Sequence, residues 1–173
     1  MTTKQILDIL KVVSWVLFIG LCIYAGAILT AFTVSLFVNT EAAKDLYMGM
    51  DLSQLHSYGL SHYIALVSLV VTLAALKAYL FFQVVKIISK VNVTHPFTKE
   101  ISTLISKIST IALQIGITAV IADGYAKWLM KKGLSFTYES GGTEFLLLAG
   151  IVFVIAQIYK RGIELQSENE LTI

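Results

Sequence analysis

The sequence predicts an all-α membrane protein that crosses the bilayer four times, as two helical hairpins. Of its 173 residues, 57% are hydrophobic and 14% are charged, whereas a soluble domain has roughly 45–50% apolar and about 25% charged residues. Four apolar runs reach or approach the roughly 20 residues that a helix needs to cross about 30 Å of hydrocarbon. The predicted spans are residues 12–38, 62–85, 108–130 and 142–159. They occupy most of the chain, so we expect one domain, residues 1–173, without a separate soluble core.

The first span is expected to remain in the mature protein. Residues 12–38 contain no charge and exceed the roughly 7–15 residues of a signal-peptide core. Cys22 is the only cysteine, which excludes a disulfide within the chain and a cysteine-based metal cluster. The net charge of +2 is too small to indicate direct binding of nucleic acid.

A hinge, residues 86–107, separates the two predicted hairpins. It contains Pro96, the only proline of the chain, which has no backbone N–H and fits only the first turn of a helix. The sequence therefore predicts that one helix ends near Lys90 and that the next opens with Pro96 at or near its first position. The candidate capping residues are Thr94, His95 and Thr98.

The distribution of basic residues predicts the orientation. Four spans place both termini and the hinge on one side of the membrane. That side carries Lys4, Lys11, Lys86, Lys90, Lys99, Lys107, Lys160 and Arg161, and the other side carries Lys44, Lys131 and Lys132. Because basic loop residues resist translocation, this excess predicts cytoplasmic termini and a cytoplasmic hinge.

Besides Glu144 at the amino end of the last span, three charged residues fall inside the predicted spans: Lys77, Asp123 and Lys127. Charges inside a membrane are costly, so each is a candidate functional residue. For Lys77 the alternative is that its long stem extends to the headgroups of the cytoplasmic side. Asp123 and Lys127 are four residues apart with the acid first, which favours an ion pair on one helix face. That pair is either a structural salt bridge or part of a binding or ion-relay site.

No motif of an enzyme, cofactor site or metal site is found. The first outer loop holds Glu41, Asp45, Asp51, His56 and His62, but their spacing matches no helical pair of metal ligands. Ser140 lies in the second outer loop, residues 131–141, and no histidine lies deep in a span to activate it. Phosphate-loop and dinucleotide fingerprints are missing as well. We therefore predict a protein that is not an enzyme and uses no cofactor.

The cytoplasmic tail, residues 160–173, is acidic and ends on apolar residues, which fits either a solvated tail or a docking segment. Its candidate partner-binding residues are Glu164, Leu165, Glu168, Asn169 and Glu170, and those of the hinge are His95, Pro96 and Phe97.

The tail from Lys160 to Ile173 and the hinge around Pro96-Phe97 resemble a bacterial four-helix membrane family, domain of unknown function 2975. The resemblance extends over the whole chain in length and span order, with His95 standing where the family usually has asparagine. It implies residence in the bacterial cytoplasmic membrane. Members are often encoded beside a small Cro-like helix-turn-helix repressor, which implies a transcriptional regulator as partner. The family has no established catalytic residues.

Two functions follow as hypotheses. The first is a non-enzymatic protein, embedded in the lipid bilayer, whose cytoplasmic hinge and tail bind a regulatory protein. The alternative is a small transporter or channel subunit, assembled as a homo-oligomer, that uses a polar path formed by Lys77, Gln114, Asp123 and Lys127.

Overall fold

The structure, a computed structural model, describes residues 2–91, 97–136, 138 and 140–170, with only the backbone of residues 169 and 170. All regular elements among these residues are helical, as predicted. In chain order they are α1 (Thr3–Phe37), the short helix η1 (Thr40–Lys44), α2 (Ser53–Tyr58), α3 (Leu60–Lys90), α4 (Lys99–Lys131) and α5 (Phe145–Glu170). Four of the described helices, α1, α3, α4 and α5, are long and apolar enough to cross a membrane.

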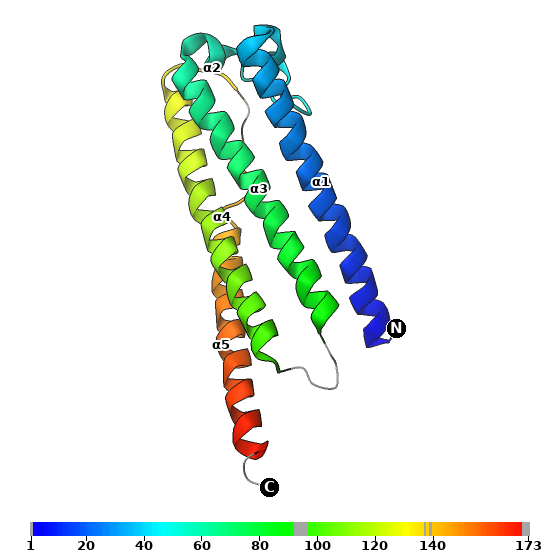
Figure 1. The fold of residues 1–173 in the computed structure, drawn as a ribbon. Coiled ribbons are helices and arrows are strands. Elements are labelled where there is room, and N and C mark those ends of the chain that lie inside the picture. The colour runs from blue at the N-terminus through cyan, green and yellow to red at the C-terminus, as the bar shows by residue number, and fades with distance from the viewer. Residues whose placement is uncertain (1, 92–96, 137, 139, 171–173) are drawn as a thin grey trace.

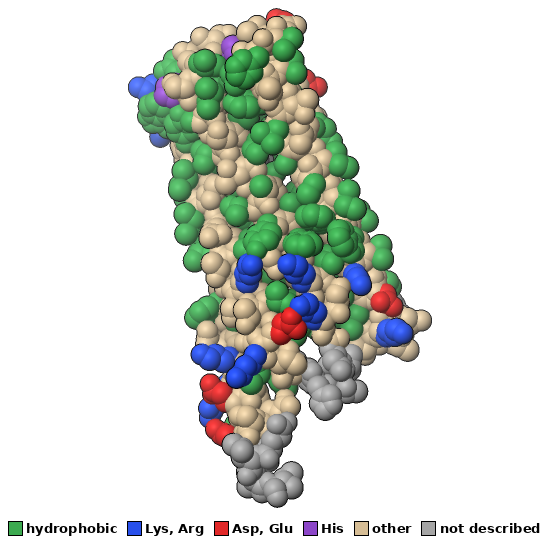
Figure 2. All heavy atoms as spheres, in the orientation of Figure 1, with side chains coloured by type: hydrophobic (Ala, Val, Ile, Leu, Met, Phe, Trp, Pro, Cys, Tyr) green, Lys and Arg blue, Asp and Glu red, His purple; other side chains and the backbone are tan. Residues whose placement is uncertain are grey.

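Both ends of the chain lie at the same end of the molecule, which we call the terminal end (Figure 1). The opposite end, the loop end, is formed by η1, α2 and the last turn of α4 (Figure 1). Hydrophobic side chains cover much of the face drawn in Figure 2, and many basic side chains gather toward the terminal end. The predicted arrangement of two hairpins with both termini on one side is therefore present.

Local signals explain where the long helices begin. Thr2 and Gln5 form a reciprocal capping box at the start of α1, which satisfies two backbone donors that the first turn leaves free. Thr98 caps α4 by accepting a hydrogen bond from the N–H of Ile101. Thr98 is thus the cap among the three predicted candidates, and the helix begins at Lys99, three residues after Pro96. His95 and Pro96 lie outside the described residues.

The four long helices are arranged in a row rather than as a closed bundle. Among the described residues, α1 packs on α3, α3 on α4, and α4 on α5, whereas α1 does not contact α5. In the most hydropathic stretch of each helix, 39% of the residues are buried in α3 and in α4, but only 11% in α1 and in α5. The row therefore has α3 and α4 at its centre and exposes long apolar faces of α1 and α5.

Two hydrophobic cores stabilise the row at different depths. The core near the loop end joins α1, α2, α3 and α4 through buried residues such as Ile28, Leu55, Tyr63 and Leu129. The core near the terminal end joins α3, α4 and α5 through residues such as Ile111, Ile115 and Ala149. The helix α1 belongs only to the first of these cores, and α5 only to the second.

The predicted span of residues 142–159 overlaps α5, but the segment before it differs from the outer loop predicted at residues 131–141. Gly142 lies against Ala119 and Ile115 of α4, and Ala119 is about 18 Å below the end of α4 at about 1.5 Å per residue. In Figure 1, α4 ends at the loop end, whereas α5 begins about halfway along the row. We call residues 134–136, 138 and 140–144 the descending segment. Its residues before Gly142 were predicted to lie in the outer loop, but the structure places Gly142 beside the middle of α4.

Two glycines permit this close approach. A Cβ atom on Gly142 would lie 2.8 Å from the Cβ of Ala119, and a Cβ on Gly116 would lie 2.5 Å from Cδ2 of Leu146. Such distances are well inside van der Waals contact, so only glycine fits at either position. The apolar part of α5, from Phe145 to Tyr159, is about 23 Å long, shorter than the roughly 30 Å of a hydrocarbon core. The descending segment supplies the missing length.

Candidate functional site

The first candidate site lies where the descending segment meets α3 and α4, and we call it the polar site: Lys77, Asp123, Tyr138, Ser140 and Gly141. The Lys77 ammonium donates hydrogen bonds of 2.8 Å to the backbone carbonyl oxygens of both Ser140 and Gly141. This corrects the alternative that Lys77 extends to the headgroups. Its stem instead turns toward the protein, because two backbone acceptors lie within its reach.

Asp123 also bonds to the descending segment. One carboxylate oxygen accepts the backbone N–H of Ser140 at 3.2 Å, and the other accepts the Ser140 hydroxyl at 2.9 Å. Within the described part of the chain, Asp123 forms no ion pair with Lys127, and Lys127 is exposed. The predicted helix-face pair is therefore wrong. The carboxylate is half-buried and turns toward two donors from the descending segment.

These bonds explain how non-helical backbone is tolerated at this depth. In hydrocarbon each unsatisfied N–H or C=O costs several kcal/mol, so irregular backbone persists only where protein groups satisfy it. Lys77 satisfies two carbonyl groups and Asp123 satisfies one N–H. Gly141 adopts φ of +52°, a left-handed conformation that glycine enters without strain. Lys77 and Asp123 thus hold the descending segment in place.

Two cavities flank the descending segment. The first, about 260 Å³, is lined by Leu21 and Tyr24 of α1, by Val70, Leu73, Ala74 and Lys77 of α3, and by Tyr138 and Ser140. The second, about 270 Å³, is lined by Asp123, Ala126, Lys127, Met130 and Tyr138. Tyr138 borders both, and its buried hydroxyl has no hydrogen-bond partner among the described residues. Such a group is an exception that calls for a functional or structural explanation.

Sequence analysis identified Lys77 and Asp123 but missed Tyr138 and Ser140. Both lie in a stretch whose polar and glycine residues are typical of a surface loop. One signal was available: the last apolar run counts only residues 142–159, fewer than the roughly 20 that a full span needs. A short final run followed by basic residues indicates that another segment must complete the crossing.

The second candidate site lies at the terminal end, where Phe97 of the hinge contacts α5. We call it the terminal face: Phe97, Tyr159, Gly162 and the predicted partner-binding residues of the tail. The rings of Phe97 and Tyr159 have centroids 5.0 Å apart, and a Cβ atom on Gly162 would lie 2.6 Å from Cε1 of Phe97. Phe97 still remains 40% exposed. Hinge and tail, predicted separately as partner-binding segments, are therefore in direct contact through Phe97.

The remaining predicted residues of the terminal face are distributed along α5. Glu164 pairs with Arg161 at 2.8 Å, Leu165 is exposed, and Glu168 is a described helical residue. The side chains of Asn169 and Glu170 lie outside the described residues. Across the hinge, Lys90 at the end of α3 pairs with Glu100 in the first turn of α4.

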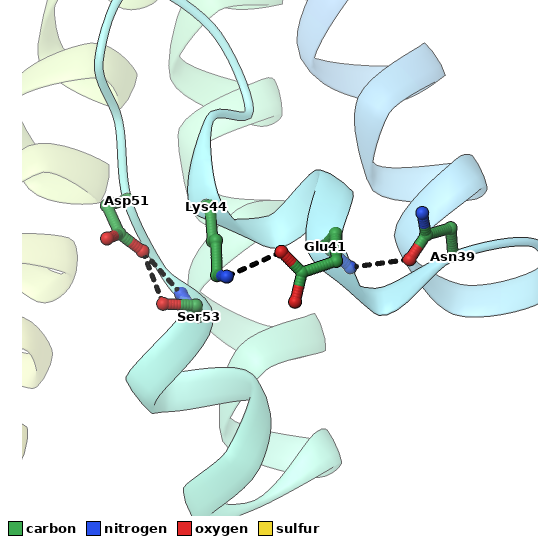
Figure 3. A network of polar contacts seen from close by, with 5 residues as sticks. All are labelled: Asn39, Glu41, Lys44, Asp51 and Ser53. Carbon is green, nitrogen blue, oxygen red and sulfur yellow. Dashed lines mark hydrogen bonds and ion pairs between the residues drawn. The ribbon is translucent and has the colours of Figure 1, made fainter.

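The acidic residues Glu41 and Asp51 of the first loop bond to nearby residues of that loop (Figure 3). Glu41 pairs with Lys44, and Asp51 accepts hydrogen bonds from the hydroxyl and the backbone N–H of Ser53. The bonds from Ser53 lower the pKa of the Asp51 carboxyl below its ordinary value of 3.8. His62 bonds to the hydroxyl of Tyr125 through Nδ1 at 2.6 Å. No three His, Cys, Asp or Glu residues in the described ranges lie close enough to hold a metal.

Four long apolar helices, with polar groups joined inside the row, define this chain as a multi-pass helical membrane protein. It belongs to the family described as "Protein of unknown function (DUF2975)", which matches residues 57–173. The family expectation is confirmed, but the match begins in α2 and leaves out α1, whereas the sequence resemblance extended over the whole chain. No curated protein and no solved structure matches the chain.

Proposed function

We propose that this protein is a non-enzymatic component of the bacterial cytoplasmic membrane whose terminal face binds a cytoplasmic protein. A small helix-turn-helix transcriptional regulator is the first partner to test. The observation that carries the proposal is the packing of Phe97 on Tyr159 and Gly162. This packing joins the hinge and the tail into a single surface. Both segments have sequence features beyond those that membrane insertion requires.

The contacts around Phe97 support a preorganised docking surface. Fixing Phe97 against α5 lowers the entropy that a partner would otherwise have to remove on binding. The Lys90–Glu100 pair connects the ends of α3 and α4 beside it. Basic residues concentrate at the terminal end, which by the positive-inside rule favours a cytoplasmic location for this surface.

Co-purification in mild detergent tests the proposal. The full-length chain is compared with a chain lacking residues 162–173 and with Gly162→Val, whose side chain would displace the ring of Phe97. Gly150→Val is the matched control, because a Cβ on Gly150 of the same helix meets nothing within 4 Å. We expect the deletion and Gly162→Val to lose the regulator and Gly150→Val to retain it. Equal recovery with all four chains would refute the proposal.

A second candidate function, a subunit of a transporter or channel, is favoured by the two cavities of about 260 and 270 Å³ beside the polar site. Because a row of four helices encloses no continuous path, this function requires a homo-oligomer, for which α1 and α5 offer exposed apolar faces. Asp123→Asn in proteoliposomes is expected to reduce flux while leaving co-purification of the regulator unchanged. Undiminished flux would exclude Asp123 from a path.

A further inference from the structure

We propose that a second copy of this chain binds to one face of the two central helices inside the membrane. We call this surface the central face, and its six residues are all exposed: Thr72, Ala75 and Tyr79 of α3, and Thr110, Gln114 and Ile117 of α4. In each helix these residues are three or four positions apart, which places them on one side of the helix. The proposal goes beyond the proposed function, because it concerns the membrane interior and not the terminal face.

The central face lies on the side of the row away from the descending segment. Gln114 precedes Asp123 by nine residues, which is about two and a half helical turns, so the two side chains leave α4 in opposite directions. Asp123 bonds to Ser140 of the descending segment. This segment therefore lies against one side of α4, and Gln114 is on the opposite, open side.

The contact between Lys107 and Tyr79 fixes the depth of the central face. The Lys107 ammonium lies over the Tyr79 ring, 5.3 Å from its centroid. Gln114 is seven residues further along α4, about two turns and about 10 Å deeper on the same side. Because α3 and α4 are antiparallel (Figure 1), Thr72, seven residues before Tyr79, reaches the same depth. Thr72 and Gln114 thus form a polar band across two neighbouring helices.

The side-chain amide of Gln114 lacks a partner within the described part of the chain. Gln114 is exposed and forms no hydrogen bond with a described residue. Lipid tails offer neither a donor nor an acceptor, so an unsatisfied amide in hydrocarbon is strongly unfavourable. Lipid alone would leave this cost in place. The Gln114 amide therefore indicates that a polar partner covers the central face.

A second copy of the chain meets this requirement. An amide has both donors and an acceptor, so the same residue of two copies related by a two-fold axis is self-complementary. The distribution of basic residues gives both copies the same orientation in the membrane, and residues of equal depth therefore meet. Gln114 of one copy then reaches the polar band of the other. Small residues such as Ala75 let the helices approach closely.

The association is measured by single-molecule photobleaching in phosphatidylcholine liposomes at a series of protein-to-lipid ratios. The full-length chain carries one fluorophore on Lys132→Cys in a Cys22→Ala background. We expect molecules with two bleaching steps to become dominant as the protein density rises. Gln114→Leu should shift the midpoint to about 5- to 30-fold higher density, the range for loss of one interhelical hydrogen bond in a membrane.

Two further variants control for the chemistry of this substitution. Gln114→Asn keeps an amide and should recover part of the association that Gln114→Leu loses. Thr30→Val is the matched control, because it removes an exposed polar group from another membrane helix, where the hydroxyl bonds to Gly26 of its own helix. The Thr30→Val chain should associate as strongly as the native chain.

Disulfide cross-linking locates the contact. In the Cys22→Ala background, Ile117→Cys tests the central face, whereas Val16→Cys and Phe153→Cys test the apolar faces of α1 and α5. All three positions are similarly exposed, at 49%, 64% and 56%. We expect oxidation to yield covalent dimers of the Ile117→Cys chain and few dimers of the other two.

Three results would overturn the proposal: a native chain that stays monomeric at the highest density, native association of Gln114→Leu, or cross-linking at residue 16 or 153 without cross-linking at residue 117. A monomer would mean that lipid or a different protein covers the central face. If Gln114→Leu does not fold, the cross-linking decides alone. None of these results depends on recovery of a regulator, so the proposal stands or falls independently of the proposed function.

Discussion

Ser140 is the residue at which the polar groups of the membrane interior meet. Its N–H and hydroxyl donate to Asp123 of α4, and its carbonyl oxygen accepts from Lys77 of α3. One residue thus links two helices through groups that hydrocarbon cannot satisfy. Ser140 thereby positions both the Lys77 ammonium and the Asp123 carboxylate.

Replacing Ser140 by alanine is expected to destabilise the protein. The change removes the hydroxyl that donates to Asp123 and leaves a carboxylate oxygen without that donor, which costs about 1–3 kcal/mol. A lower midpoint of thermal unfolding in detergent is the expected result. Ser135→Ala serves as the control, because Ser135 is exposed and only its backbone N–H makes a described bond. Equal midpoints for the two variants would contradict a structural role for the Ser140 hydroxyl.

The helix α5 begins inside the row for two reasons. The apolar stretch of α5 is too short to cross the membrane alone, and α4 has Gly116 at the position where Leu146 packs. The first turn of α5 therefore docks halfway along α4. The descending segment then needs partners for its backbone, and α3 and α4 provide Lys77 and Asp123.

Gly116→Ala is expected to disrupt this docking. The added methyl would lie 2.5 Å from Cδ2 and 3.0 Å from the backbone N of Leu146, and overpacking of this kind costs typically about 1–3 kcal/mol. Gly124→Ala, on the same helix, meets nothing within 4 Å and is expected to be neutral or stabilising, since alanine favours helix. Thermal unfolding of the two variants provides the comparison. A Gly116→Ala protein as stable as Gly124→Ala would mean that α5 docks elsewhere.

The depth of the descending segment is measurable by labelling. In a Cys22→Ala background, Thr143→Cys is expected to resist a membrane-impermeant maleimide added to both sides, because residue 143 adjoins Gly142 about 18 Å below the end of α4. Lys132→Cys, directly after α4 at the loop end, should react. Rapid labelling at position 143 would instead support the surface loop that the sequence predicts at residues 131–141.

The whole molecule is a row of helices whose two outer members expose apolar faces. Among described residues α1 touches neither α4 nor α5, so lipid or another copy of the chain must cover these faces in the membrane. Because the number of long helices is even, both termini lie at one end (Figure 1). This end also carries the terminal face, which ties the proposed function to the orientation of the whole chain.

The orientation has its own test. A reporter that fluoresces only in the cytoplasm, fused in turn to each end of the chain, should give a signal in both fusions. The physical reason is the excess of basic residues at the terminal end. A fusion at residue 132 should remain dark. A signal from residue 132, with both ends dark, would place the terminal face outside the cytoplasm and refute the proposed docking of a regulator.

Sequence analysis correctly predicted the all-α class, the four apolar helices and the shared side of the two termini. These features follow from the composition and from the length of the apolar runs, which are properties of each segment taken separately. It also singled out Lys77 and Asp123, because any charge in an apolar run is conspicuous. The depth at which α5 begins and the groups that these charges contact came from the three-dimensional fold alone. The depth of α5 and the partners of Lys77 and Asp123 depend on how closely neighbouring segments approach one another. At Gly116 and Gly142 the approach is close because glycine has no side chain. The hydropathy of a single segment does not reveal this.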